Sequence, residues 1–382
     1  MHTIFHTPIS FCLGDGSEEN PYRSKDGCAG IAEAMQEAGE RGCNVYLPSA
    51  RYDHSAPIVL RAPSTGLRGE IWACNTDPNG VFEAKNGTKL RRIGTGFPSI
   101  LVGDDRTLSG NDISHLGIQG DIVGMDTRSR FSVENPTADC GLAFTRTRVD
   151  QAHFTRLSFC GLGAAIVVAE NAELDACDFC DVNLDGCGVG VYFAPAASYY
   201  TYFRRCVVAD TPFYGFYAAP APKRAHNLEI RECFFVRNGG ALDRGDEKAA
   251  AVSLREVHNS MLRDNLFDDP GLFWYYDDNA TENRSRQPSR IPLRALYLEG
   301  NGNFIEGNQF KHCKSGAAYV KGDRNILHST VTSGDIIIEG RGNTVSSLFF
   351  TTDDARLVLR GEAAKTTEVI GVSAERIVYE ES

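Results

Sequence analysis

The sequence predicts an all-β fold in which short parallel strands stack as the coils of a solenoid. Three apolar positions, separated by three residues and then by two, form a signature that recurs along the chain at varying intervals. A second short apolar segment follows most copies, and the middle position of successive copies holds residues of the same kind. Units of this size cannot bury their apolar face alone, so each requires a neighbouring coil.

The spacing within the signature predicts two strands joined by a bend. Its two-residue step is the period of a strand, whereas its three-residue step would turn a side chain to the opposite face of a straight strand. We expect the middle residues to point inward, the thiols as small apolar fillers and the amides as a hydrogen-bonded ladder. These middle residues include Leu157, Cys177, Cys206, Cys233, Asn265 and Asn308. The copies are Ile113/Leu116/Ile118, Phe154/Leu157/Phe159, Leu174/Cys177/Phe179, Phe203/Cys206/Val208, Ile230/Cys233/Phe235, Leu262/Asn265/Phe267, Ile305/Asn308/Phe310, Ile326/Ser329/Val331 and Val345/Leu348/Phe350.

The segments after the signature supply the third strand of each coil. They are short and rich in Val, Ile, Phe and Tyr, which favour strands. Three strands per turn give a triangular coil, which resembles a right-handed, single-stranded parallel β-helix similar to the pectate lyase and polygalacturonase superfamily. The predicted third strands are 165–169, 189–193, 214–218, 252–255, 296–299, 318–321, 336–339 and 357–360.

The N-terminal stretch resembles the same superfamily, in which a helix caps the open end of the solenoid. A helix is predicted over 29–40, and its apolar spacing indicates one buried face. That face is carried by Ile31, Ala32, Met35 and Ala38. The matching motifs are Gly14-Asp15-Gly16, Asp26, Asn44-Val45-Tyr46-Leu47-Pro48, Tyr52 and Gly69. This resemblance specifies the fold and leaves the chemistry open.

The 382 residues are expected to form one domain, because a solenoid grows by adding coils and needs no second core. The N-terminal cap and first strands are placed in 1–70, the coils in 71–360 and the C-terminal end in 361–382. Two insertions, 238–250 and 268–292, leave the coils at the same corner and are expected to overhang one face. Loops raised beside a flat sheet make the walls of a cleft.

The amino-acid composition and net charge limit the classes of partner that the protein is expected to bind. The net charge of −11 argues against nucleic acid, which requires a basic face. No apolar stretch is long enough to span a membrane, and residues 1–14 lack the pattern of a signal peptide. The 12 cysteines are therefore interpreted as mostly reduced thiols in a cytoplasmic protein. Cys177 and Cys180 form no metal site in this interpretation, because no second pair follows at zinc spacing.

The outward positions of the third strands gather aromatic and charged residues, which suits a sugar with its apolar ring faces and polar hydroxyls. One predicted column holds Tyr192, Tyr217, Arg255, Glu299, Lys321 and Glu339, and its neighbour includes Tyr297 and Tyr319. The candidate substrate-binding residues are Tyr192, Tyr217, Arg255, Trp274 of the longer insertion, Tyr297, Tyr319 and Lys321. The alternative is that the charges alternate in sign only to form a solvated salt-bridge ladder.

Carboxylates near this face are candidates for catalysis. Glycosidic cleavage commonly uses two carboxyl groups, one protonated to assist the leaving oxygen and one ionised to activate water or attack carbon. Glu299 with Asp269 or Asp268 is the first candidate pair, and Asp210 and Asp246 are the reserves. No cofactor is required for this chemistry, and no metal site is predicted.

A second charged set lies on the bend before the signature's last strand. It comprises Asp175, Arg204, Arg231, Arg263 and Glu306, with Arg205, Glu232 and Asp264 beside it. The stacked arginines suit carboxylates or sulfates, but acids lie at both ends of the row. We interpret this set as a structural ladder or a subunit interface, and many relatives of the fold form trimers, so a homotrimer is possible.

The sequence departs from known subfamilies in its motifs. The central polygalacturonase motifs Gly-His-Gly and Arg-Ile-Lys are absent, and Asn75-Thr76-Asp77 occurs too early in the chain. The segment 263–267, Arg-Asp-Asn-Leu-Phe, is similar to one in the inulin fructotransferases, which are trimeric β-helices that convert fructans to cyclic difructose products. The glutamate that this family has on the next strand aligns with Tyr297.

The functional hypothesis is an enzyme that cleaves or rearranges a glycosidic bond of an oligosaccharide by a carboxylate pair. Two alternatives remain open. A polysaccharide lyase acting on an acidic glycan would use Arg255 or Lys321 as base or charge neutraliser. A non-catalytic β-helix would serve as a carbohydrate-binding scaffold or a fibre.

Overall fold

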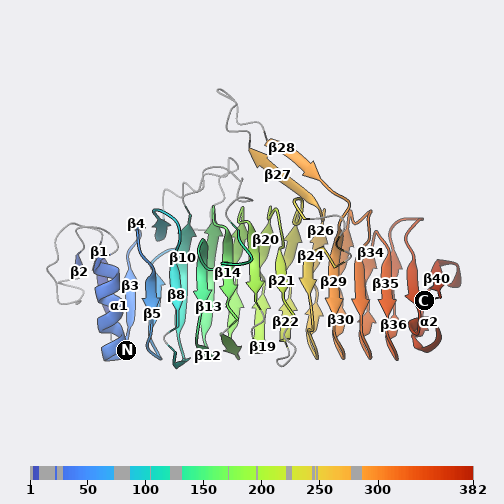
Figure 1. The fold of residues 1–382 in the computed structure, drawn as a ribbon, viewed down its shortest axis with the longest axis horizontal. Coiled ribbons are helices and arrows are strands. Elements are labelled where there is room, and N and C mark those ends of the chain that lie inside the picture. The colour runs from blue at the N-terminus through green and yellow to red at the C-terminus, as the bar shows by residue number, and fades with distance from the viewer. Residues whose placement is uncertain are drawn as a thin grey trace.

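The strands of the protein stack side by side along its longest axis, with one helix at the N-terminal end (Figure 1). The computed structural model describes residues 3–7, 22–23, 29–72, 87–103, 105–120, 131–170, 172–194, 197–220, 226–242, 246, 248–276 and 286–381. Within these ranges no helix is long and apolar enough to cross a membrane.

One wall of the solenoid is a 12-stranded sheet in which every described pairing is parallel. It contains the predicted third strands, with bounds that differ by up to two residues from those expected. Its strands are, in spatial order, β5 (Ile58–Leu60), β8 (Ile100–Val102), β11 (Cys140–Phe144), β14 (Ala164–Val168), β18 (Val189–Phe193), β21 (Phe216–Ala218), β24 (Ala250–Leu254), β29 (Arg294–Glu299), β32 (Ala318–Lys321), β35 (Ile336–Glu339), β38 (Leu357–Arg360) and β40 (Ile377–Glu380).

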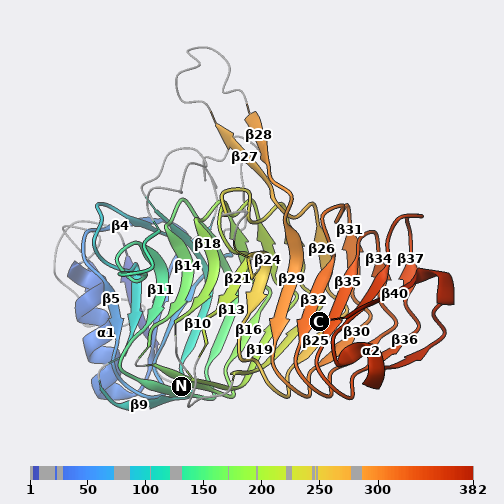
Figure 2. The same cartoon turned by 45° about the vertical axis from the view of Figure 1, so that its right-hand side comes forward.

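The remaining walls form a 26-stranded sheet that wraps around the bends. Figure 2 shows the coils from a second direction. The strands are β1 (Thr3–Thr7), β2 (Tyr22–Arg23), β3 (Asn44–Leu47), β4 (Arg51–His54), β6 (Gly66–Gly69), β7 (Lys89–Arg92), β9 (Thr107–Ser109), β10 (Asp112–Gln119), β12 (Arg148–Asp150), β13 (His153–Cys160), β15 (Glu173–Asp175), β16 (Asp178–Cys180), β17 (Asn183–Asp185), β19 (Ala197–Arg204), β20 (Val207–Ala209), β22 (His226–Arg231), β23 (Phe234–Val236), β25 (Met261–Arg263), β26 (Leu266–Asp268), β30 (Phe304–Glu306), β31 (Gln309–Lys311), β33 (Ile326–His328), β34 (Val331–Thr332), β36 (Thr344–Ser346), β37 (Phe349–Phe350) and β39 (Glu368–Ile370).

Both ends of the solenoid carry short helices. The helix α1 (Ala29–Arg41) confirms the predicted cap, and it packs against β1, β3 and β5. Its buried face uses Ala34 where the sequence predicted Ala32, which is exposed. At the other end α2 (Ala363–Thr366) and the 3₁₀ helix η1 (Ala374–Arg376) connect the last strands. Coil stacking continues to β40, which pairs with β38.

The three-residue step of the signature is a single residue in the left-handed backbone region. In the copy Phe154/Leu157/Phe159, Arg156 has φ 53°, and the three apolar side chains are buried. Equivalent bends lie at Arg205, Glu232 and Asp264. A left-handed residue bends the chain between two strands and adds one residue to the two-residue spacing. The side chains three positions apart therefore both point inward.

Two copies of the signature were wrong in register. Phe179 pairs with Phe154 and Phe203, so the copy in that coil is Phe179/Val182/Leu184, and Leu174/Cys177/Phe179 spans the preceding bend at Ala176. In the eighth copy the inward residues are Leu327/Thr330/Thr332: Leu327 is 3% exposed and Ile326 is 41% exposed. The apolar pattern missed this copy because two of its inward residues are threonines. Ile326 and Val331 point outward but have the apolar spacing of the signature.

The inward polar residues form ladders that follow the coils. The side chain of Asn308 accepts hydrogen bonds from the backbone N–H and the amide of Asn265, and it donates to the Leu262 carbonyl. At the same position in preceding coils, the thiols of Cys206 and Cys233 donate to carbonyls of the coil before. The amide ladder is therefore confirmed, and the thiols extend it as weak donors.

A second amide ladder runs along the preceding bend. The side-chain oxygen of Asn325 accepts hydrogen bonds from the backbone N–H and the amide of Asn303. The backbone N–H of Asn325 in turn donates to the side-chain oxygen of Asn343. All three amides are buried. These ladders satisfy backbone groups at bends, where strand pairing leaves them without partners.

Candidate functional site

The outer face of the 12-stranded sheet carries an aromatic column whose register differs from the predicted one. Strand pairing aligns Tyr192 with Tyr217, Tyr217 with Ser253, Ser253 with Tyr297, and Tyr297 with Tyr319. Tyr192 and Tyr217 therefore share a column with Tyr297 and Tyr319, and not with Glu299. The alignment of the strands is set by their buried residues, such as Phe216 with Val252. The predicted column was wrong because it placed Tyr192 and Tyr217 two residues away from their true partners on the later strands.

Most of these tyrosines are covered, which corrects the expectation that they are exposed. Tyr192, Tyr297 and Tyr319 are 5%, 1% and 2% exposed. The Arg294 guanidinium lies 4.9 Å from the Tyr319 ring centre, and Arg360 lies 5.6 Å from it. Long cationic side chains of the flanking columns thus cover the rings of the C-terminal coils.

The next outward column changes character along the molecule. It begins with small residues and continues with long charged residues that alternate in sign. By strand register it reads Thr145, Ala169, Ala194, Ala219, Arg255, Glu299, Lys321, Glu339, Arg360 and Glu380. Lys321 lies 3.5 Å from Glu339, and Arg360 lies 2.9 Å from Glu380. The predicted salt-bridge ladder is therefore present in the last coils.

Arg255 stands at the junction of the small and charged parts of this column. Its guanidinium lies 5.3 Å from the Tyr217 ring centre and 3.3 Å from the Asp246 carboxylate. The backbone N–H of Lys248 donates to Asp246 at 2.9 Å, and the Lys248 ammonium lies 3.5 Å from Glu299. Glu299 also accepts from the Tyr297 hydroxyl at 3.3 Å. Lys248 therefore links the two carboxylates, since its backbone binds Asp246 and its side chain lies beside Glu299.

A groove of about 560 Å³ adjoins this junction on the N-terminal side. Its floor includes Tyr192 and Tyr217 with Ala194 and Ala219 beside them, and residues 133–137 form a wall. Glu134, Arg146 and Glu170 also line it. The wall is held by Phe131, whose ring lies 5.2 Å from Tyr192 and 5.9 Å from Phe213.

Burial raises the pKa of the phenols that line the groove. It raises the pKa of Tyr192 to about 12, and it also raises the pKa of Tyr217. The Ser132 hydroxyl donates to Glu134 at 2.7 Å and lowers the pKa of that carboxyl. At neutral pH the groove therefore presents phenol hydroxyls, which both donate and accept, beside an ionised carboxylate.

Asp268 and Asp269 lie at a different place from Glu299. They end β26, at the corner where the longer insertion begins, and the chain returns there because the Ile291 N–H donates to the Gly271 carbonyl. Glu299 is the last residue of β29, about 16 Å further along that strand at 3.3 Å per residue. The first candidate pair is therefore not brought together.

Asp268, Asp269 and His312 form the group of described residues that could hold a metal ion. Their donor atoms lie within 4.8 Å of one another. The Nδ1 atom of His312 lies 2.7 Å from a carboxylate oxygen of Asp268, so the two side chains form a hydrogen bond with each other. The sequence predicted no metal site here, because His312 lies on the coil after the one that carries Asp268 and Asp269.

Asp210 lies on the same corner, in a bidentate pair. It is buried, and Arg237 binds its two oxygens at 2.8 and 2.7 Å. This pairing raises the pKa of Arg237, chiefly through the hydrogen bond. Asp210 is thus bound by a cation of the next coil and faces neither the groove nor Glu299.

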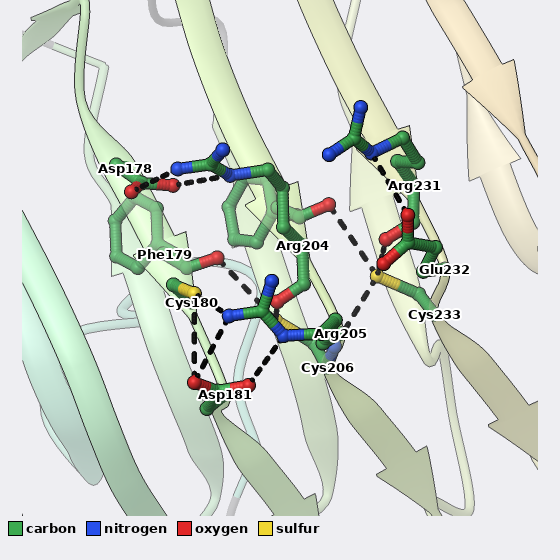
Figure 3. Close-up of polar contacts among 11 residues, drawn as sticks. Asp178, Phe179, Cys180, Asp181, Arg204, Arg205, Cys206, Arg231, Glu232 and Cys233 are labelled. Carbon is green, nitrogen blue, oxygen red and sulfur yellow. Dashed lines mark hydrogen bonds and ion pairs between the residues drawn. The ribbon is translucent and has the colours of Figure 1, made fainter.

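The arginine set of the 26-stranded sheet is paired with acids, which lie on neighbouring coils for Arg204 and Arg205 and on the same coil for Arg231. Figure 3 shows Arg204 on Asp178, and Arg205 on Asp181 and the thiol of Cys180. Arg263 lies 3.2 Å from Glu306. This arrangement matches the predicted structural ladder, and the subunit interface stays a prediction.

The longer insertion projects from the coils as an antiparallel hairpin of β27 (Leu272–Tyr276) and β28 (Arg286–Arg290) (Figure 1). Trp274 lies on β27, and its side chain is outside the described part of the structure. Sequence reasoning missed the groove residues Glu134 and Glu170, and it missed Lys248 beside Glu299. The run of alanines after successive strands could have located the groove, whereas residues 133–137 carry no periodic signal.

The sequence matches the family model described as right handed beta helix region over residues 163–350. The whole chain is similar in fold to DFA-IIIase from Arthrobacter chlorophenolicus A6. Its complex with DFA-III has a TM-score of 0.69 and 14% identity, covering 98% of this chain and 96% of that chain. Its complex with GF2 has a TM-score of 0.68 and 14% identity, with the same coverage of both chains. Its structure without its lid has a TM-score of 0.68 and 15% identity, also with that coverage. No curated protein matches the sequence.

These findings define the class of protein. The chain is a right-handed parallel β-helix, as the resemblance to the pectate lyase superfamily predicted. At such low identity the likeness to DFA-IIIase is a likeness of fold.

Proposed function

We propose that the protein is a carbohydrate-active enzyme that cleaves or rearranges a glycosidic bond of an oligosaccharide at the outer face of the 12-stranded sheet. The observation that carries this proposal is the junction of Asp246, Arg255 and Glu299 at the end of the tyrosine-floored groove. DFA-IIIase, which has the same fold, binds the oligosaccharides GF2 and DFA-III.

The favoured catalytic pair is now Asp246 with Glu299. The sequence had favoured Glu299 with Asp268 or Asp269. One carboxyl group would protonate the leaving oxygen, and the other would activate water or attack the anomeric carbon. Arg255 and Lys248 orient both carboxylates through the contacts described above. The Tyr297 hydroxyl donates to Glu299, so it holds the carboxylate in one orientation.

The test is to incubate the purified protein with a panel of oligosaccharides and to measure product masses. Addition of one water per cleavage identifies a hydrolase, and fragments that sum to the substrate mass identify internal transfer or elimination. Ultraviolet absorbance of an unsaturated uronide separates elimination, the lyase alternative, from transfer. No mass change with any glycan would overturn the enzyme proposal and favour a binding scaffold.

Glu299→Gln and Asp246→Asn are each expected to lower turnover at least about a hundredfold, because each removes a general acid or base. The matched control is Glu306→Gln, since Glu306 is as exposed as Glu299 and is paired with Arg263 on the other sheet. Turnover is measured for all three variants alongside thermal unfolding. Unchanged turnover in Glu299→Gln would place the active site elsewhere.

A further inference from the structure

The groove exists because one outward column lacks long side chains over part of its length. At Ala169, Ala194 and Ala219 the column offers a methyl group, whereas every later coil has Arg, Lys or Glu at the same register. Arg255 is the first of these long residues, and it lies against Tyr217. The length of the groove is thus set by where the alanines end.

The charges around the groove are mainly negative. Glu134 and Glu170 line it, and Arg146 is the cation among its described lining residues. The guanidinium of Arg255 at its end is already engaged by Asp246. Carboxylates accept hydrogen bonds from sugar hydroxyls, whereas a uronate brought next to Glu134 or Glu170 meets like charge at the exposed rim of the groove.

We propose that the alanine-floored groove is a saccharide subsite that admits uncharged sugar units and excludes acidic ones, with Glu134 as the residue that sets this preference. The inference rests on the proposed function, because it assigns the groove to the substrate of the adjoining carboxylate pair. Glu134 suits this role because Ser132 fixes its carboxylate on a wall that Phe131 anchors to the floor.

The experiment measures binding by titration calorimetry in the Glu299→Gln background, which suppresses turnover. The probes are GF2, cellotetraose and xylotetraose as neutral sugars, and tetragalacturonate as an acidic one. Ala219→Arg places in the groove the side chain that the next coil carries at that register. Gln309→Arg is the control, because it adds the same group at an exposed position of β31 on the other sheet.

We expect a neutral probe to bind the parent protein, to lose at least about tenfold in affinity in Ala219→Arg, and to bind Gln309→Arg unchanged. We expect Glu134→Gln to raise the affinity for tetragalacturonate about fivefold, the upper range for one exposed charge pair. Tetragalacturonate binding the parent protein as tightly as the neutral probes would overturn the preference.

Neutral binding that survives Ala219→Arg, with turnover still abolished by Asp246→Asn, would overturn the subsite and leave the proposed function standing. Failure of every probe to bind, together with no turnover of the panel, would overturn both. The two failures are therefore distinguishable.

Discussion

Asp210 shows how a residue with catalytic chemistry can serve the fold. Its carboxylate is buried and is compensated by the guanidinium of Arg237 through two hydrogen bonds. A buried ion pair adds little net stability, but removing one partner leaves a charge without compensation. Asp246, by contrast, is exposed and contacts Arg255 beside the groove.

Arg237→Ala is expected to destabilise the protein by about 3 kcal/mol, because it removes the bidentate cationic partner of the buried Asp210 carboxylate. Arg263→Ala is the control, since its pair with Glu306 is exposed and is worth less than about 1 kcal/mol. Chemical denaturation measures both. Equal losses in the two variants would contradict the special position of Asp210.

At the scale of elements, each bend combines a left-handed residue with an inward side chain that bonds to the adjoining coils. Asn265 and Asn308 do this with amides, and Cys206 and Cys233 do it with thiols. Amides both donate and accept, so they satisfy groups in both directions along the solenoid. Thiols fill the same space with weaker bonds.

Asn308→Ala is expected to cost about 2 kcal/mol of stability, because it leaves the Leu262 carbonyl and the Asn265 N–H buried without their partner. Gln309→Ala is the matched control: the next residue also carries an amide, but its side chain is exposed. Urea unfolding of the two variants compares them. A cost below about 0.5 kcal/mol for Asn308→Ala would show that the ladder adds nothing to the bend.

At the scale of the whole molecule, the buried phenols make stability depend on alkaline pH. Tyr192 and Tyr214 each have their pKa raised to about 12 by burial. Unfolding exposes them, and an exposed phenol ionises near pH 10. Between about pH 10 and 12 the unfolded chain therefore binds fewer protons than the folded one, and stability falls as pH rises.

Tyr192→Phe is expected to reduce this fall by up to about 1.4 kcal/mol for each pH unit above 10. Tyr200→Phe is the control, because Tyr200 is 60% exposed. Denaturant midpoints at pH 8 and pH 11 give the comparison. An identical fall in both variants would mean that burial of Tyr192 is not a source of the alkaline sensitivity.

The site is an assembly of the whole molecule, which limits how much of it the sequence could predict. Asp246 and Lys248 come from one insertion, Glu299 from the end of β29, and Glu134 from a segment far earlier in the chain. The candidate residues Arg255, Glu299 and Tyr217 were predicted on one face, because alternation along a strand is local. Their neighbours were not, since insertions of unequal length separate the coils.

The sequence by itself determined the stacked coils, the buried face of the N-terminal helix and the inward amides, because burial imposes a period that can be counted along the chain. The right hand of the solenoid was predicted from the resemblance to the pectate lyase superfamily. Only the tertiary structure decided the alignment of one coil with the next. That alignment placed Tyr192 and Tyr217 beside Ala194 and Ala219 in the lining of the groove, and it left Tyr319 covered by the side chains of Arg294 and Arg360. The physical reason is that register between coils depends on hydrogen bonds and packing between distant segments, for which the spacing within one coil carries no record.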